Sequence, residues 1–248
     1  MDPGYSSLAM GELLNLDLER KAVAVREHLI AAVREHTRVV YSNSLGAEAM
    51  VLTDIICTHV PGIDMFSIDT GRLHQETYDL LEKLERRYER SLPLVYPDAQ
   101  ALERLVSARG INGFYHSLEA RLACCQVRKV EPFKRAIEGY AAWVTGVRRE
   151  QSPSRAEAQP LEWDSQYGLY KLSPLLDWSE TEIWQYIRVR RLPYNSLHDR
   201  HFPSIGCFPC TRAIQPGESR RAGRWWWEQP ESRECGLHPR VRHAAAQA

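Results

Sequence analysis

The sequence predicts an α/β fold built on a parallel sheet, followed by an irregular C-terminal segment. Short apolar, β-branched runs alternate with amphipathic segments over residues 38–190, a pattern typical of βαβ units. After about Asn195 the alternation stops, and the chain becomes rich in His, Pro, Gly, Arg and Trp. We therefore expect an N-terminal helical segment (1–36), an α/β domain (37–211) and a C-terminal tail (212–248) without a core of its own.

The individual elements follow from local patterns along the chain. Apolar runs predict strands at Arg38–Ser42, Ile63–Ile68, Leu94–Tyr96, Ala141–Thr145 and Leu169–Leu172. Apolar residues at helical spacing predict helices at Glu12–His36, Ala47–His59, His74–Arg90, Ala99–Arg109 and Ser179–Arg190. The last helix opens with Ser179 followed by Glu182, the spacing of a capping box.

Composition narrows the classes of partner. The 32 Lys and Arg residues balance 32 Asp and Glu residues, so we expect neither nucleic acid nor membrane as a partner. Residues 1–18 lack the pattern of a signal peptide, and we find no stretch typical of a transmembrane helix. We therefore expect a protein of the reducing cytoplasm, where structural disulfides are rare. Composition leaves the oligomeric state open, a homo-oligomer included.

The end of the first expected strand carries a candidate phosphate loop. In open parallel sheets, ligands bind beyond the carboxyl ends of the strands. Small residues let backbone N–H groups approach an anion, and the N-terminus of the next helix adds partial positive charge. The loop residues are Ser44, Leu45, Gly46, Ala47 and Glu48. An ordinary βα turn remains the alternative. The next strand ends at Asp69, Thr70 and Gly71, where a ribose or base could lie.

Four of the six cysteines suggest a metal centre. Cys57 lies in an apolar helical pattern and is interpreted as a core residue. The pair Cys207 and Cys210 forms a C-x-x-C, which taken alone also fits a thioredoxin-like dithiol. Cys124 and Cys125 are adjacent and cannot easily bond to each other. Together the four thiolates suit a zinc site or a [4Fe–4S] cluster, and the contiguous pair favours iron–sulfur.

Basic residues cluster in three places, which favours a small anionic ligand. Arg128 and Lys129 follow the cysteine pair and are able to offset the negative charge of a thiolate cluster. Arg148, Arg149 and Arg155 lie in a turn-rich loop that suits an oxyanion clamp. Arg220, Arg221 and Arg224 precede three tryptophans. A solvated surface is the alternative for each group.

Cys235 is a candidate nucleophile. It follows the Arg- and Trp-rich stretch and has no partner among the other cysteines in the sequence pattern. A thiol that attacks sulfur must be a thiolate, and nearby cations favour that state. A single cysteine near a chain end is more often without a role, so position alone does not decide this.

Taken together, these segments resemble the assimilatory adenylyl-sulfate (APS) and phosphoadenylyl-sulfate (PAPS) reductase family. The matching stretches are SNSLGAEAMVL, IDTGRLHQETY, CCQVRKVEP, TGVRREQSPSR, LSPLLDWSETEIWQYI, PYNSLHDRHFPSIGCFPCT, PGESRRAGRWWWE and ECGLH. The resemblance implies a Rossmann-like parallel sheet of the adenine nucleotide α-hydrolase (pyrophosphate-loop) type. Residues 37–211 would then bind nucleotide and the iron–sulfur cluster, and the tail would carry the catalytic cysteine.

The resemblance also implies a reaction, namely reduction of APS to sulfite and AMP in sulfate assimilation and cysteine biosynthesis. Cys235 would attack sulfur to form an S-sulfonate, which thioredoxin or glutaredoxin would resolve. Lys129 would lie between substrate and a [4Fe–4S] cluster. The implied cluster ligands are Cys124, Cys125, Cys207 and Cys210. The implied substrate contacts are Ser44 to Glu48, Asp69, Thr70, Gly71, Arg148, Arg149, Arg221 and Arg224.

Several alternatives stay open. Family members with all four cysteines resemble the APS type, whereas a PAPS reductase or a dual-substrate enzyme is the nearest alternative. Ala49 departs from the acidic residue of many relatives, which leaves the fine structure of the loop uncertain. A pyrophosphate-loop sulfurtransferase would require a lysine-bearing ATP loop that SNSLGAEA lacks. A non-catalytic iron–sulfur or thiol sensor, and a zinc form of the site, complete the set.

Overall fold

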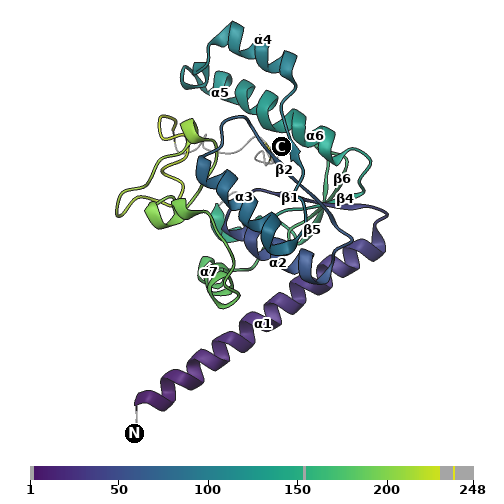
Figure 1. Ribbon diagram of the computed structural model, residues 1–248, viewed down its shortest axis with the longest axis vertical. Helices are drawn as coiled ribbons and strands as arrows, with labels where there is room; N and C mark the ends of the chain where they lie inside the picture. Colours follow the sequence, from purple (N-terminus) through teal and green to yellow (C-terminus); the bar gives the residue numbers. More distant parts are fainter. Residues whose placement is uncertain (1–2, 153–154, 230–236, 238–248) are drawn as a thin grey trace, which may run out of the picture. The chain divides into compact units, whose positions relative to one another are not determined.

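The structure is a computed structural model that describes residues 3–152, 155–229 and 237, with side chains from Leu16 onward. Figure 1 shows its elements in order along the chain. The helices are α1 (Pro3–Glu35), α2 (Ala47–His59), α3 (Gln75–Tyr88), α4 (Ala99–Arg109), α5 (Leu118–Cys125), α6 (Glu131–Ile137) and α7 (Glu180–Val189). The strands are β1 (Val39–Asn43), β2 (Asp64–Ile68), β3 (Leu94–Val95), β4 (Ala142–Val144), β5 (Leu161–Asp164) and β6 (Leu169–Leu172).

The strands form one mostly parallel sheet in the order β3-β2-β1-β4-β6-β5. The pairs β1–β4, β4–β6 and β2–β3 are parallel, whereas β5 runs antiparallel to β6. The predicted α/β class is therefore confirmed. Strand β5 was not expected, because it is an edge strand whose large side chain Trp163 is 57 % exposed and carries no core pattern. Chain order reverses between β1 and β4, the place where open α/β sheets bind ligands.

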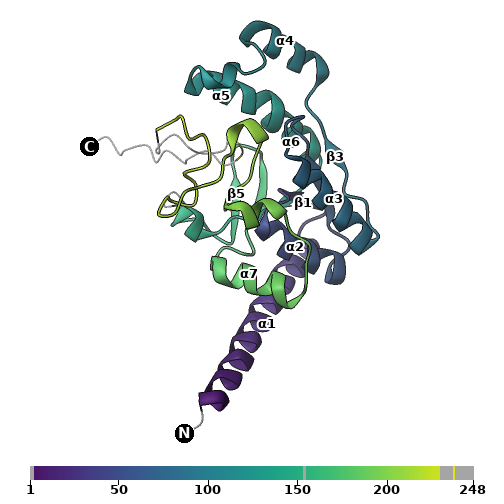
Figure 2. The ribbon, with the colours of Figure 1, turned by 60° about the vertical axis from the view of Figure 1, so that its left-hand side comes forward.

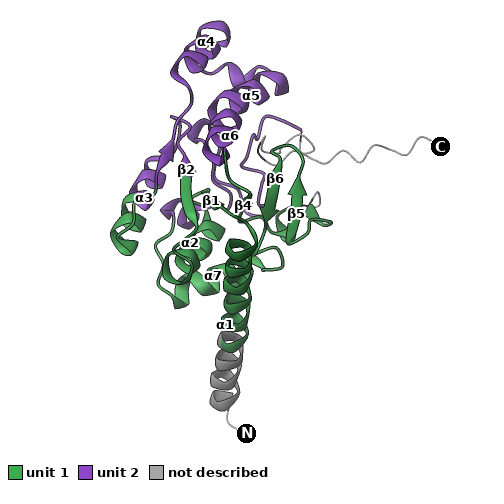
Figure 3. Cartoon of the chain, turned by 90° about the vertical axis from the view of Figure 1, so that its right-hand side faces the viewer, with its two compact units in different colours: residues 1–66, 82–92, 139–194 green, residues 67–81, 93–138, 195–248 purple. Residues whose placement is uncertain are grey.

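The chain forms two compact units that interleave along the sequence (Figure 3). Unit 1 comprises residues 1–66, 82–92 and 139–194. Unit 2 comprises residues 67–81, 93–138 and 195–248. Because each unit collects three separate stretches, no single cut in the sequence separates them.

The core of unit 1 forms around β1, β4 and α2. All three residues of β4 are buried, and eight residues of α2 are buried, so this helix has almost no solvent face. Helices α1, α2 and α7 lie next to one another in both Figures 1 and 2. The described part of α1 buries one stripe at helical spacing: Leu18, Ala22, Val25, Leu29 and Ala32.

Helix α7 begins with the capping box that the sequence predicted. The Ser179 hydroxyl accepts a hydrogen bond from the Glu182 N–H at 3.2 Å, and the Glu182 carboxylate accepts one from the Ser179 N–H at 2.7 Å. Glu182 also pairs with Lys21 of α1 at 2.5 Å. The cap therefore fixes both the start of α7 and a contact to the N-terminal helix.

Unit 2 contains little regular structure after Asn195, as predicted, but it does form a small core. Beyond this point the described chain has only two short turns of 3-10 helix, η5 (Ser196–Arg200) and η6 (Phe208–Cys210). Yet Phe114, Cys207, Cys210 and Trp225 form a buried cluster, with Cys124 and Trp227 packed against it. The expectation of a tail without core was wrong, because aromatic and cysteine side chains supply enough apolar surface to pack.

Helices α5 and α6 are joined by a five-residue π-helix, η2 (Gln126–Val130). Pro132 at the start of α6 lacks the N–H that an α-helix would direct at the Arg128 carbonyl. The wider turn follows Cys124 and Cys125 directly, and such insertions recur at functional sites. Within the described chain, no helix is long and apolar enough to cross a membrane.

Candidate functional site

The loop between β1 and α2 is held in an unusual backbone conformation. Leu45 has φ of 56°, a left-handed value that side chains other than glycine rarely adopt. Its side chain is buried, and its N–H donates to the Asn43 side-chain oxygen at 2.8 Å. Gly46 is the N-cap of α2 and offers no side chain to accept its first N–H groups. This 13-residue helix thus presents an N-terminus suited to an anion.

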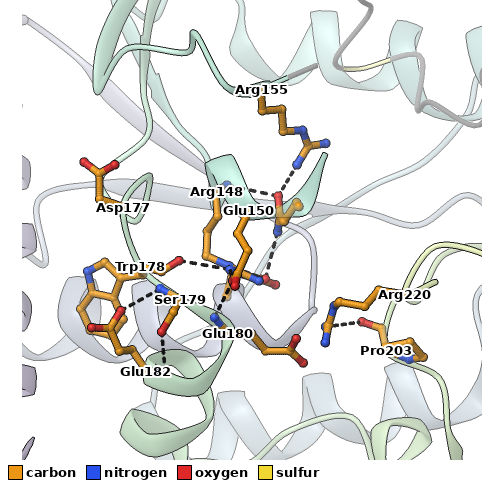
Figure 4. Close-up of polar contacts among 12 residues, drawn as sticks. Arg148, Glu150, Arg155, Asp177, Trp178, Ser179, Glu180, Glu182, Pro203 and Arg220 are labelled. Carbon is orange, nitrogen blue, oxygen red and sulfur yellow. Dashed lines mark hydrogen bonds and ion pairs between the residues drawn. The ribbon is translucent and has the colours of Figure 1, made fainter. Parts of the chain in front are cut away.

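Glu48 and Arg148 join the carboxyl ends of β1 and β4. Arg148 Nε donates to Glu48 Oε1 at 2.9 Å, and Gln151 donates to the same oxygen at 2.9 Å. A second Arg148 nitrogen donates to the Glu150 carboxylate at 2.7 Å and to the Trp178 carbonyl at 3.1 Å (Figure 4). Arg148 is only 2 % exposed. Its guanidinium is therefore engaged by acceptors of the protein itself.

Arg149 is also held by neighbouring groups of unit 1. One of its nitrogens forms an ion pair with Asp177, and another donates to the Ala158 carbonyl at 2.9 Å. The side chain is one-third exposed, which leaves it more accessible to a ligand than Arg148. In the same region Glu150 accepts a hydrogen bond from the Glu180 N–H at 2.8 Å (Figure 4). The loop after β4 is thereby tied to the start of α7.

The turn after β2 contacts cysteine-bearing parts of unit 2. Asp69 accepts hydrogen bonds from the Gly71 N–H at 2.7 Å and from the Tyr78 hydroxyl at 3.0 Å. Burial and the bond to this carboxylate raise the pKa of Tyr78 to about 12. The Thr70 hydroxyl lies 3.2 Å from the Cys207 sulfur, and the Thr70 carbonyl accepts from Arg128 at 2.6 Å.

Four cysteines from two distant stretches border one cavity, which we call the cysteine pocket. Its empty volume is about 360 Å³, counted with the part open to solvent. The cysteines are Cys124, Cys125, Cys207 and Cys210. The remaining lining residues are Arg72, Phe114, Arg121, Arg128, Lys129, Pro209 and Trp225. Sulfur donors are thus surrounded by aromatic rings and by cations.

Local structure explains how the pocket forms. The π-helix after Cys125 puts Arg128 and Lys129 on the same side as the cysteine pair, where all four line the pocket. Burial raises the pKa of the Cys124 thiol, and Arg128 partly opposes this. Burial, reinforced by Cys207, raises the pKa of Cys210 to about 12. These thiols stay protonated near neutral pH unless a cationic group enters the pocket.

The C-terminal part of the pocket is built around Trp225, which is 1 % exposed. Its ring lies under the guanidinium of Arg121 at 4.7 Å and of Arg224 at 4.5 Å, and Arg221 lies 5.9 Å away. Arg224 also donates to the Ile205 carbonyl at 3.0 Å. Sequence reasoning missed Arg121 and Trp225; the spacing of three and four residues from Arg121 to the cysteine pair was the available signal. Cys235 lies outside the described residues.

Residues 38–213 match the family model described as the phosphoadenosine phosphosulfate reductase domain. The chain belongs to this reductase family. The family membership predicted from the motifs is thus confirmed. A relative from Allochromatium vinosum, named adenosine 5'-phosphosulfate reductase, is 54 % identical over 221 residues, covering 89 % of this chain and 86 % of the relative. A relative of the same name from Burkholderia cepacia is 45 % identical over 232 residues, covering 94 % and 93 %.

Solved structures agree with the reductase family. The phosphoadenylyl-sulfate (PAPS) reductase of Candida auris, in a phosphate complex, has a TM-score of 0.65 and 26 % identity, covering 77 % of this chain and 90 % of that one. The FMN adenylyltransferase of Candida glabrata has a TM-score of 0.57 at 18 % identity, covering 92 % and 81 %. The second likeness shows the fold alone, the predicted pyrophosphate-loop type of sheet.

Proposed function

We propose that this protein reduces adenylyl sulfate to sulfite and AMP, in the assimilation of sulfate and the synthesis of cysteine. The observation that carries the proposal is the cysteine pocket, in which four sulfur donors and several cations gather in a chain of the reductase family. Relatives that share about half of its residues over most of its length are named for this activity.

The nucleotide would bind at the ends of the central strands. The exposed Ser44, Gly46 and the uncapped N-terminus of α2 are suited to the phosphate. Leu45, Ala47 and Glu48 would shape that loop, and Asp69, Thr70 and Gly71 would border the nucleoside. We assign Arg149, Arg221 and Arg224 to the phosphosulfate. Because Arg148 is buried among acceptors, it would act by holding the loop in place.

The cysteine pocket would hold a [4Fe–4S] cluster on Cys124, Cys125, Cys207 and Cys210. No group of three or more His, Cys, Asp or Glu side chains in the described chain is arranged to hold a single metal ion. The donor set instead fits a cluster, since four thiols border a shared cavity and cations offset their charge. When bound, the cluster would supply electrostatic stabilisation beside the substrate. Lys129 would then lie between cluster and sulfate.

Cys235 would be the nucleophile. Its thiolate attacks the sulfate sulfur, a Cys–S–SO₃⁻ bond forms, and the bond from sulfur to the phosphate oxygen breaks to release AMP. A dithiol protein, thioredoxin or glutaredoxin, then attacks the sulfur of Cys235. Sulfite leaves with the electron pair, the dithiol becomes a disulfide, and the Cys235 thiol is regenerated. A PAPS-specific or dual-substrate enzyme would use the same steps.

Mass spectrometry of the anaerobic, iron-loaded protein tests the proposal. The protein is mixed with APS or with PAPS, without a dithiol. We expect one added SO₃ on the peptide that contains Cys235, forming faster with APS. Faster reaction with PAPS would reassign the substrate, whereas no adduct with either would favour a sulfurtransferase or a sensor. Zinc in place of iron, measured on the same sample, would contradict the cluster.

A further inference from the structure

A buried ion pair joins the wall of the cysteine pocket to the segment that precedes Cys235. Arg121 Nε and a second Arg121 nitrogen donate to the two Glu228 oxygens, each at 2.9 Å. The two side chains are 1 % and 5 % exposed. A bidentate, buried pair of this kind fixes both distance and orientation, which surface pairs do not.

Arg121 belongs to the pocket as well as to the ion pair. It lies on α5, three residues before Cys124 and four before Cys125, so it shares their face of the helix and lines the pocket with them. The Cys125 thiol and the Glu228 carboxylate both favour its charged form, against the effect of burial. One guanidinium is therefore placed between a cysteine sulfur and a carboxylate.

Glu228 lies in a tight turn that is fastened to the pocket at a second point. The Glu228 N–H donates to the Trp225 carbonyl at 2.8 Å, and the Trp225 N–H donates to the Cys210 carbonyl at 3.2 Å. Trp225 has φ of 44°, a left-handed value that a tryptophan holds only when its surroundings impose it. Arg121 lies over this ring. Cys235 follows seven residues after Glu228.

We propose that Arg121 is a positioning residue, which couples occupancy of the cysteine pocket to the anchoring of the segment that carries Cys235. The proposal rests on the proposed function for the cluster and for the role of Cys235. Four thiolates in the pocket place negative charge beside Arg121 and hold it at the pocket wall. Its fork geometry then holds Glu228, and Glu228 fixes the point from which the last residues leave unit 2. Loss of the cluster removes that charge and loosens the anchor.

The first test uses Glu228→Gln, which keeps the shape of the side chain and removes its charge. A matched control is Glu218→Gln, because Glu218 forms a similar two-bonded pair with Arg212 that is about one-third exposed and does not line the pocket. We expect adduct formation on Cys235 at saturating APS to slow by about 10- to 100-fold in Glu228→Gln. AMP affinity should stay within about twofold, and the control should react like the parent.

The second test is limited trypsin digestion, read as cleavage after Arg233. The iron-loaded protein should be cleaved slowly, and the iron-depleted protein and iron-loaded Glu228→Gln should both be cleaved faster. Arg121→Lys keeps a charge but loses the fork, so it should recover part of the parent's adduct rate. Equal cleavage of loaded Glu228→Gln and loaded parent would overturn the proposal.

Two further outcomes separate the proposals from each other. If Glu228→Gln and Arg121→Lys both fail to retain iron, the pair serves pocket assembly and the positioning role is wrong. If the parent forms no adduct, the proposed function fails. The digestion of loaded against depleted protein still tests the anchor in that case, because it does not depend on chemistry at Cys235.

Discussion

Replacing Arg148 by Met should destabilise the protein substantially. The change removes hydrogen bonds to Glu48, Glu150 and the Trp178 carbonyl from a guanidinium that is 2 % exposed. Removing one partner of a buried ion pair costs about 3–5 kcal/mol. Glu48 and Glu150 are 19 % and 57 % exposed, so water compensates part of this loss. We therefore expect a loss of about 3 kcal/mol, the lower end of that range.

Thermal unfolding measures this effect directly. For a chain of this size each kcal/mol shifts Tm by about 2–4 °C, so Arg148→Met should melt about 6–12 °C below the parent. The control is Arg86→Met, which breaks a pair with Glu82 whose side chains are 75 % and 71 % exposed. That change should cost about 0.5 kcal/mol or less.

The result also decides between two roles for Arg148. If Arg148 acts mainly on the substrate, its removal should leave stability near that of the Arg86→Met control while weakening nucleotide binding. A Tm within about 2 °C of that control would refute the structural reasoning. The expected large drop would instead identify the side chain as the brace between the ends of β1 and β4.

Three further predictions follow from other sites. A methyl group at Gly206 would lie 2.3 Å from the Arg224 guanidinium, so Gly206→Ala should cost about 1–3 kcal/mol in urea unfolding, whereas Gly62→Ala, with open space around it, should not. Burial raises the pKa of Glu182, but bonds from Lys21 and its own cap outweigh this and lower it; the stabilisation is present above pH 4.5 and is lost as pH falls through the folded value. The stability gap between parent and Glu182→Gln should therefore close in acid. Serine at any pocket cysteine should lower bound iron and visible absorption, and unchanged iron would contradict the cluster.

Local sequence patterns predicted most of the fold. The expected strands and helices appear at their places with ends shifted by a few residues, and the capping box at Ser179 forms as its spacing predicted. These features depend on neighbours within one or two turns of chain, which a sequence displays directly. The hairpin of β5 escaped notice because a half-exposed edge strand has no apolar run.

The candidate site divides in the same way. Residue chemistry indicated four sulfur donors, a phosphate loop and several arginines, because those side chains have few other uses at such spacings. The partners of each arginine were not predictable from sequence. Arg148 finds Glu48 a hundred residues away, and Arg121 finds Glu228 more than a hundred residues away.

The sequence alone thus determined the class of fold, the family and the chemical groups of the site. Tertiary structure decided which groups are held by the protein and which are left for a ligand. Burial is the physical reason: it makes an ion pair specific, raises the pKa of a thiol and orients a guanidinium, and it depends on chain segments that meet only in the folded state.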